Sequence, residues 1–277
     1  MIHLLASTDY TKVHPLFQGV HLSLVVDGVL AGNSTGLLWV DDLDHPRTAL
    51  MWDNAYSIYM VGEAGNHKFN QALSEFFATQ LVPAARVRNI DGFKIAYSDP
   101  TWESQMATIF PAMTLGHYPR VVYTVGNRRP SGWQSRLPPG YAMRPINRAL
   151  LADPTLGNLP DLVEEIEQCW PSQERFLSHG FGFCLVGDGE IICRCTAEYV
   201  STGKCGIGIA TAEPHRQRGF ATLTASAFIE ECARRQITPY WDAWLRNTAS
   251  VATAEKVGLH KVQDHWVFVG PLETARR

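Results

Sequence analysis

The part of this 277-residue chain best suited to chemistry is a basic turn between an apolar stretch and a helix. Residues 204–212 are strand-like, and residues 220–235 place apolar side chains at helical spacing. Arg216 and Arg218 bring positive charge to the turn, and Gly219 has no Cβ, so an anion can approach the main chain closely. The start of a helix adds N–H groups without intrahelical partners. We therefore predict a diphosphate-binding turn; a plain connection with solvated arginines is the alternative.

The pattern Arg216-x-x-Gly219-x-Ala221 after a strand resembles the coenzyme A-binding signature of the GNAT acyltransferases, the Gcn5-related N-acetyltransferases. Downstream, residues 247–250 and 254–259 resemble the last helix of that family and its ending. Residues such as 206–211 and 238–242 resemble a subgroup that includes zwittermicin-resistance-type acetyltransferases. The resemblance covers most of the chain.

The resemblance implies that acetyl-CoA is the bound cofactor. Its pantetheine arm would pair with the main chain of the strand, where an N–H near Ile209 would polarise the thioester carbonyl. Asn247 would reach the arm from the end of the following strand. The implied cofactor-binding residues are Ile209, Ala210, Thr211, Arg216, Gln217, Arg218, Gly219, Phe220, Ala221, Thr222, Asn247 and Ser250.

Two positions depart from the family pattern. The last-helix tyrosine that would protonate coenzyme A is Ala254 here, and the usual strand carboxylate is replaced by Gly206. Asp242 is our first choice as base or substrate anchor, with a capping or core-edge aspartate as the alternative. A base that acts through water, or none at all, is a further alternative. The other candidates for proton transfer are Glu198, Tyr240 and His215, of which Tyr240 is also a core candidate and His215 a solvent- or phosphate-facing one.

The implied activity is transfer of an acetyl group to an amine of a small molecule, by direct attack in a ternary complex without a covalent enzyme intermediate. A base is needed because free amines with a pKa near 10 are mostly protonated at neutral pH. The subgroup resemblance points to an antibiotic or another amino-containing metabolite as acceptor. A catalytically inactive acyl-CoA-binding regulatory protein is the alternative function.

The predicted fold is α/β with a mixed sheet, divided into an N-terminal α/β domain (1–126), a linker (127–140) and a GNAT domain (141–277). A distant duplication would make the first part a degenerate GNAT-like half. Its expected elements are strands at 21–30, 37–40 and 49–61, a helix at 66–81, and a strand–helix–strand passage at 92–125. In the second part we expect a strand at 141–146, a helix at 159–170, a hairpin at 181–199, then strand, helix, strand, helix and strand at 204–212, 220–235, 238–243, 248–257 and 262–269. Four aromatic residues of the first part are core or acceptor-wall candidates: Trp39, Trp52, Tyr56 and Tyr59.

Composition excludes several other classes of protein. The formal net charge of −3 argues against a nucleic-acid surface. The longest stretch without charged residues, 104–119, is too polar to span a membrane, and the N-terminus lacks the basic start of a signal peptide. The six cysteines include no Cys-x-x-Cys pair, which favours the reducing cytoplasm. We predict no metal site, because the acidic turn 41–45 fits no complete ligand set; a homodimer is an assembly that the sequence allows.

A further motif in the first part of the chain does not predict an active site. Residues 32–36 match the hydrolase pattern G-x-S-x-G, which requires a strand before the serine and a helix after it. Strand-like residues follow instead, so we expect a turn.

Overall fold

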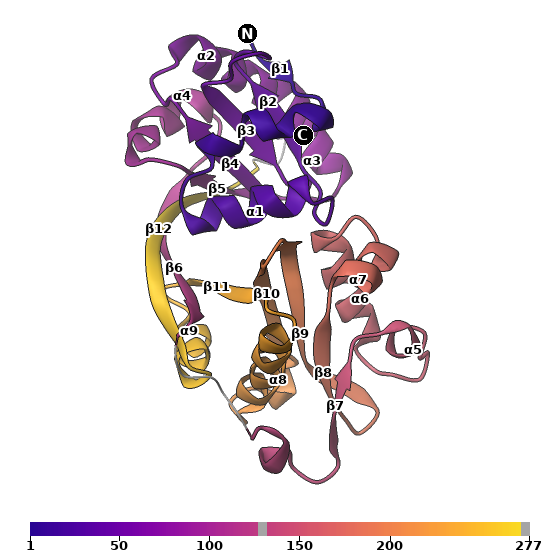
Figure 1. The fold of residues 1–277 in the computed structure, drawn as a ribbon. Helices are drawn as coiled ribbons and strands as arrows, with labels where there is room; N and C mark the ends of the chain where they lie inside the picture. Colours follow the sequence, from indigo (N-terminus) through magenta and orange to yellow (C-terminus); the bar gives the residue numbers. More distant parts are fainter. Residues whose placement is uncertain (127–131, 273–277) are drawn as a thin grey trace. The chain divides into compact units, whose positions relative to one another are not determined.

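A computed structural model describes residues 1–126 and 132–272 as a mixed α/β fold, which confirms the predicted fold class (Figure 1). The chain divides into two compact units. Unit 1 contains Met1–Val26, Thr35–Arg120 and the described residues from His265 onward, and unit 2 contains Asp27–Ser34 and Val121–Asp264. The domain limits 1–126 and 141–277 stay a prediction, and residues 127–131 of the expected linker lie outside the described residues.

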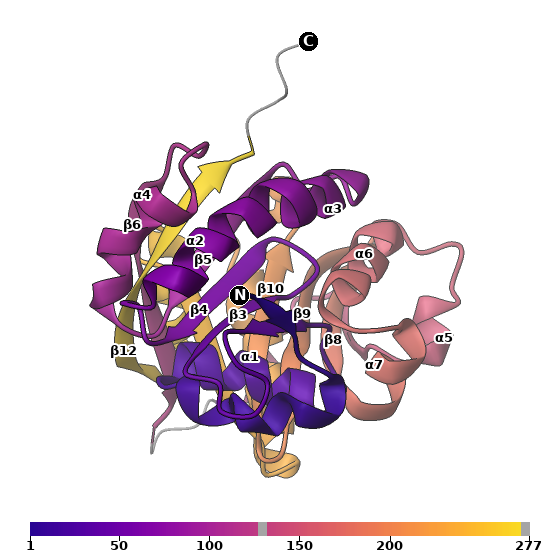
Figure 2. The same ribbon diagram turned by 90° about the horizontal axis from the view of Figure 1, so that it is seen from above.

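The sheet of unit 1 has the order β1-β2-β3-β4-β5-β12. β4 and β5 are parallel, and the other pairs of neighbours in this sheet are antiparallel. Helices α2 and α3 cover one face and α1 the other (Figure 2). The strands are β1 (His3–Leu4), β2 (Leu37–Val40), β3 (Thr48–Trp52), β4 (Ser57–Gly62), β5 (Gly92–Tyr97) and the end of β12 (Leu259–Pro271). The helices are α1 (Val20–Leu30), whose residues 27–30 belong to unit 2, α2 (His67–Phe76), α3 (Val82–Val87) and α4 (Met106–Ile109).

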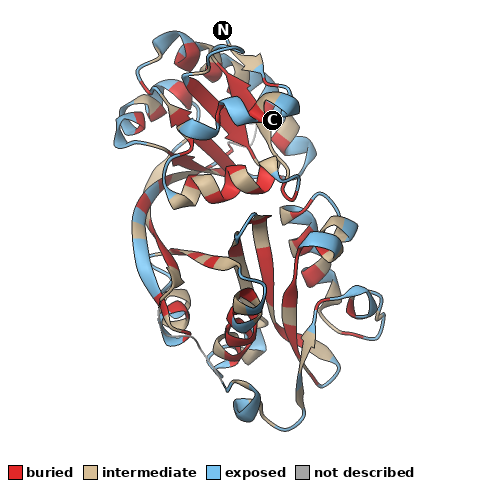
Figure 3. Ribbon diagram, in the orientation of Figure 1, coloured by how far each residue is buried: buried red, intermediate tan, exposed pale blue. Residues whose placement is uncertain are grey.

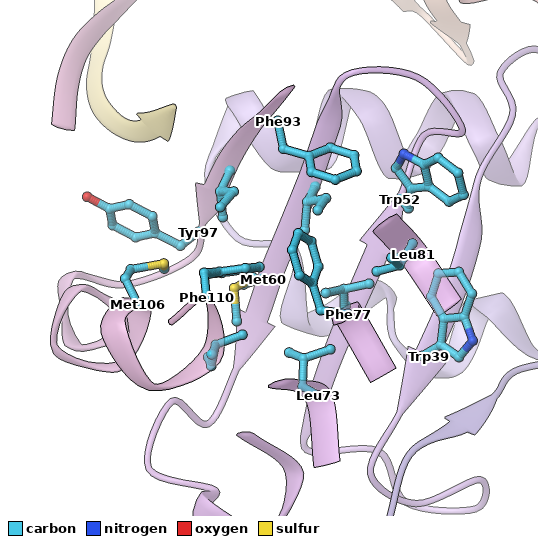
Figure 4. Close-up of a cluster of buried hydrophobic side chains, with 14 of the residues drawn as sticks. Trp39, Trp52, Met60, Leu73, Phe77, Leu81, Phe93, Tyr97, Met106 and Phe110 are labelled. Atoms are coloured by element: carbon cyan, nitrogen blue, oxygen red, sulfur yellow. The ribbon is translucent and has the colours of Figure 1, made fainter. Parts of the chain in front are cut away.

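The core of unit 1 is aromatic. β3 and β4 are buried along nearly their whole length (Figure 3). Phe77 packs edge-on against Phe93 and Phe110, and Trp39 and Trp52 lie in the same cluster (Figure 4). These two tryptophans are therefore core residues.

The expected strand at 21–30 is wrong, because these residues form helix α1. The many valines suggested a strand, but Leu22, Val25, Val26 and Val29 recur at helical spacing and all four are buried. Burial of one helical stripe thus outweighs β-propensity. The expected single run 49–61 is two strands, β3 and β4, joined by a turn.

The sheet of unit 2 has the order β12-β6-β11-β10-β9-β8-β7, in which residues 259–264 of β12 belong to this unit. β10 and β11 are parallel, whereas β7 to β10 are joined by antiparallel pairs. The strands are β6 (Gly116–Val125), which begins in unit 1, β7 (Tyr141–Pro145), β8 (Gly182–Gly187), β9 (Glu190–Ser201), β10 (Lys204–Thr211) and β11 (Thr238–Trp244). The helices are α5 (Arg148–Leu151), α6 (Leu159–Cys169), α7 (Gln173–His179), α8 (Phe220–Arg234) and α9 (Thr248–Lys256), of which α5 and α7 were not predicted.

The predicted strand and helix between residues 204 and 235 are confirmed as β10 and α8. Ile207 and Ile209 of β10 pack in one cluster with Ala225 and Ile229 of α8. Side chains alternate along a strand, so Gly206, Gly208 and Ala210 face away from α8. The isoleucines of β10 thus pack against α8, and only glycine and alanine lie on the opposite face of this stretch.

Candidate active site

A groove opens where β10 and β11 stop pairing. The two strands are in register from Lys204↔Thr238 to Gly206↔Tyr240, and β10 continues to Thr211. Beyond the paired part lies a groove of ≈ 750 Å³. Its walls are residues 209–211 of β10, the turn at 215–217, the first residues of α8 at 219–222, Trp241, and one face of α9.

The start of α8 ends this groove with unpaired backbone donors. Gly219 is the N-cap residue, with φ of 80°, and no side chain caps the helix. The carbonyl of Gly219 accepts the first intrahelical hydrogen bond, from the N–H of Leu223. The N–H groups of residues 220–222 therefore have no intrahelical acceptor. A Cβ placed on Gly219 would meet nothing within 4 Å. The helix end is therefore open to an anion.

The two arginines of the turn point to different places. Arg216 lines the groove, and its Nε donates to the carbonyl of Thr211 at 3.3 Å. The guanidinium of Arg218 instead donates to the hydroxyl of Tyr141 at 3.1 Å and lies 4.8 Å from the ring centre of Phe220. All the predicted cofactor-binding residues line the groove except Arg218.

Asn247 and Ser250 are structural as well as groove-lining. The side-chain oxygen of Asn247 caps α9 by accepting from the Ser250 N–H at 3.1 Å. The Ser250 hydroxyl accepts from the indole N–H of Trp241 at 2.9 Å, which ties α9 to β11. This geometry leaves the side-chain nitrogen of Asn247 able to donate into the groove.

Sequence reasoning missed several lining residues. Ala249, Ala252, Thr253 and Lys256 form one stripe of α9, because residues three and four apart share a face of a helix. That spacing was a signal that could have found them. Trp241 also lines the groove, and no signal in the sequence separated it from a core residue.

The other candidates beside the groove are a histidine and a thiol. His215 Nε2 lies 2.9 Å from Glu190 Oε1, and its Nδ1 lies 3.3 Å from the guanidinium of Arg218, so it fixes the turn. The Thr211 hydroxyl donates to Cys193 Sγ at 3.2 Å, and burial raises the pKa of that thiol. Cys193 is therefore held as a neutral thiol, which is a poor nucleophile.

The predicted proton-transfer residues lie on the other face of the same strands. Gly206 is paired with Glu198 of β9 and with Tyr240 of β11. Trp241 and Ala243 are buried against α8 and α9, so alternation turns Tyr240 and Asp242 to the opposite face. The structure thus brings these three candidates to one face but not into the groove lining. We call Glu198, Tyr240 and Asp242 the carboxylate face.

Glu198 fills the space that glycine leaves on β10. A Cβ on Gly208 would lie 2.3 Å from Glu198 Oε1 and 2.6 Å from Thr196 Oγ1. The carboxylate therefore lies over the groove strand, although it comes from the neighbouring strand. Ala254, in contrast, is fully buried, and its side chain has no group that could donate a proton.

Unit 1 also has a strand that leads into a helix beside a parallel strand, but the start of that helix differs from the start of α8. There β4 leads through residues 63–66 into α2, and β4 and β5 are parallel. The Asn66 side chain accepts from the Phe69 N–H at 3.2 Å and donates to Asp41 at 2.9 Å. A capped helix end beside a carboxylate is unsuited to a diphosphate.

The described residues hold neither a metal-ligand cluster nor a helix that could span a membrane. Within residues 1–126 and 132–272, no three His, Cys, Asp or Glu side chains lie close enough together to hold a metal ion. None of the helices in those ranges has the length and apolar character needed to cross a bilayer.

Comparison with known proteins gives consistent matches. A family model described as GNAT acetyltransferase matches residues 14–268. The uncharacterised N-acetyltransferase YdfB of Bacillus subtilis (strain 168) is 23% identical over 266 residues, covering 95% of this chain and 97% of that protein.

Solved structures share the fold. A GCN5-related N-acetyltransferase-like protein from Streptococcus suis 89/1591 has a TM-score of 0.70 at 20% identity, covering 95% of this chain and 99% of that one. A tandem GNAT protein from the clavulanic acid biosynthesis pathway has a TM-score of 0.59 at 12% identity, covering 99% of each chain.

Proposed function

Because the chain belongs to the GNAT acetyltransferase family, we propose that it transfers an acetyl group from acetyl-CoA to an amine of a small molecule. The observation that carries the proposal is the groove between β10 and α9, which ends at the uncapped N-terminus of α8. A diphosphate there would accept from the N–H groups of residues 220–222 and face Arg216. The pantetheine arm would lie along residues 209–211, within reach of the Asn247 side-chain nitrogen.

The carboxylate face suits the acceptor. Acetyl-CoA supplies the activated acetyl group, and the amine must lose a proton before its nitrogen can bond to the acetyl carbon. We assign Glu198 as the base, because its carboxylate lies over Gly208 of the groove strand. Asp242 then attracts the ammonium form of the acceptor, and Tyr240 remains a candidate donor to the departing thiolate. The amide N–C bond forms as the C–S bond breaks.

Direct attack is favoured over an acyl-enzyme. The thiol beside the groove, Cys193, is buried and neutral, and no hydroxyl of the groove is paired with a histidine base in the described contacts. Both substrates would therefore be bound together, one on each face of the divergent strands.

We also propose an acceptor class, a subgroup, a location and an assembly for this protein. An antibiotic or other amino-containing metabolite as acceptor, and the zwittermicin-resistance-type subgroup, rest on the sequence resemblance. The six cysteines are free thiols, which suits a reducing cytoplasm. A homodimer would be tested by light scattering.

The test is release of coenzyme A thiol from acetyl-CoA, measured with benzylamine, 1,4-diaminobutane and glucosamine as acceptors, together with calorimetric titration of acetyl-CoA. We expect saturable binding and thiol release that depends on an amine. Binding without turnover on any amine would favour the alternative, an acyl-CoA-binding regulatory protein, for which the absent helix tyrosine at Ala254 is the supporting observation.

A further inference from the structure

A β-bulge in β9 turns a second tyrosine toward the carboxylate face. The β9–β10 register shifts between Lys204↔Ser201 and Gly206↔Glu198, so that Tyr199 and Val200 together oppose the single residue Cys205. Tyr199 has a φ of 49°, in the left-handed region. Bulges of this kind normally have glycine at that position. A large side chain held there is a strained backbone feature of the sort that gathers at functional sites.

The bulge places Tyr199 beside Glu198 rather than on the opposite face. A Cβ on Gly206 would lie 3.2 Å from Cδ2 of Tyr199 and 3.5 Å from Cβ of Glu198. Tyr240 reaches the same glycine from the other neighbouring strand. Two phenol side chains therefore flank Gly206, next to two carboxylates.

Residues 27–34, which belong to the same compact unit, hold the bulge in place. Asp27 forms an ion pair with Lys204, on the far side of the bulge. A Cβ on Gly28 would lie 2.8 Å from the Tyr199 Cα, so the end of α1 touches the bulged backbone. Asn33, which is buried, donates to the Val200 carbonyl at 2.8 Å. Asn33 belongs to the segment 32–36 that matches the hydrolase pattern, so this segment holds the backbone of β9 in place.

A second contact orients Asn33. Its side-chain oxygen accepts from Arg175 Nε at 2.8 Å, and the Arg175 guanidinium also donates to the Ala31 carbonyl at 2.8 Å. The bulge is thus fixed by contacts from α1, the turn after it and α7. Such support is what a side chain needs to be held in a strained but useful position.

We propose that Tyr199 is a substrate-positioning residue, whose ring contacts the ammonium-bearing end of an aliphatic primary amine next to Glu198 and Asp242. An aromatic face attracts a cation, and the neighbouring carboxylates add charge complementarity. The substrate class is therefore an alkylamine that is protonated when it binds and gives its proton to Glu198. This inference rests on the proposed acetyl transfer and adds the residue that selects the acceptor.

The test compares Tyr199→Phe, which keeps the ring, with Tyr199→Asn, which removes it but tolerates the left-handed backbone. We measure the affinity of 1,4-diaminobutane for protein saturated with coenzyme A, the KM for the same amine, the affinity for acetyl-CoA, and the Tm. We expect Tyr199→Phe to stay within about threefold of wild type and Tyr199→Asn to lose about tenfold in amine affinity. The acetyl-CoA affinity should not change, and the Tm of Tyr199→Asn should hold or rise.

Two results would overturn the inference. One is an unchanged amine affinity in Tyr199→Asn. The other is a fall in Tm accompanied by equal losses for both substrates, which would make the ring merely structural. A wild-type protein that binds the diamine but releases no thiol would refute the proposed transfer instead, and the binding comparison would still decide the role of Tyr199.

Discussion

Replacing Gly208 by alanine should disable the reaction without changing any charge. The added Cβ would lie 2.3 Å from Glu198 Oε1, whereas ordinary contact begins at 3.4 Å, so the carboxylate must retreat by about 1 Å. The same Cβ would lie 2.6 Å from Thr196 Oγ1, so the Thr196 side chain must shift as well. Misplacing a reacting group by that distance costs about 100-fold in rate. We therefore expect kcat to fall about 100-fold.

The assay is amine-dependent thiol release, with calorimetric titration of acetyl-CoA alongside. Gly208→Ala should leave the acetyl-CoA affinity unchanged, and Gly65→Ala, whose Cβ meets nothing within 4 Å, is the matched control. Because both changes act on one group, Gly208→Ala combined with Glu198→Gln should lose little more than Glu198→Gln alone. A kcat for Gly208→Ala within about threefold of wild type, or losses that multiply in the double variant, would refute the role of Glu198 as the base.

Two further predictions concern stability. Bonds from Arg234 and Arg235 lower the pKa of Glu231 to about 2, so its contribution is present above its ordinary pKa of 4.5 and is lost as the pH falls toward 2. Glu231→Gln should lower the free energy of unfolding by about 1–2 kcal/mol at pH 7, a modest loss because the partner arginines are exposed. In urea unfolding, the difference between wild type and variant should shrink below pH 4.5. A difference that does not depend on pH would contradict this prediction. Asn66→Ala removes the α2 cap and should lower the free energy of unfolding, measured in urea, by about 1–2 kcal/mol. An unchanged free energy of unfolding would contradict this prediction.

Local signals in the sequence predicted the parts of the fold that depend on neighbouring residues. The alternation of β10, the helical face of α8 and the glycine between them are all local, and together they located the groove strand and the helix start. Helix α1 was missed because its valines favour a strand, and only burial of one stripe decides otherwise.

The carboxylate face required information that is not local. Glu198 was a candidate from its strand, but its place over Gly208 follows from the pairing of β9 with β10. Tyr199 could not be found, because one shift in register decides which face it occupies. The direction of Arg218 is likewise set by Tyr141, far away in the sequence.

Diphosphate binding at the start of α8 is tested by calorimetric titration of acetyl-CoA into Gly219→Asn and Gly219→Asp. Both side chains tolerate the left-handed conformation at this position, where a Cβ has open space, and they differ essentially in one negative charge. If a diphosphate binds the N–H groups at the start of α8, Gly219→Asp should bind acetyl-CoA about 100-fold more weakly than Gly219→Asn, because like charges would face each other. Equal affinities for the two variants, both still folded, would show that no diphosphate binds at this helix end.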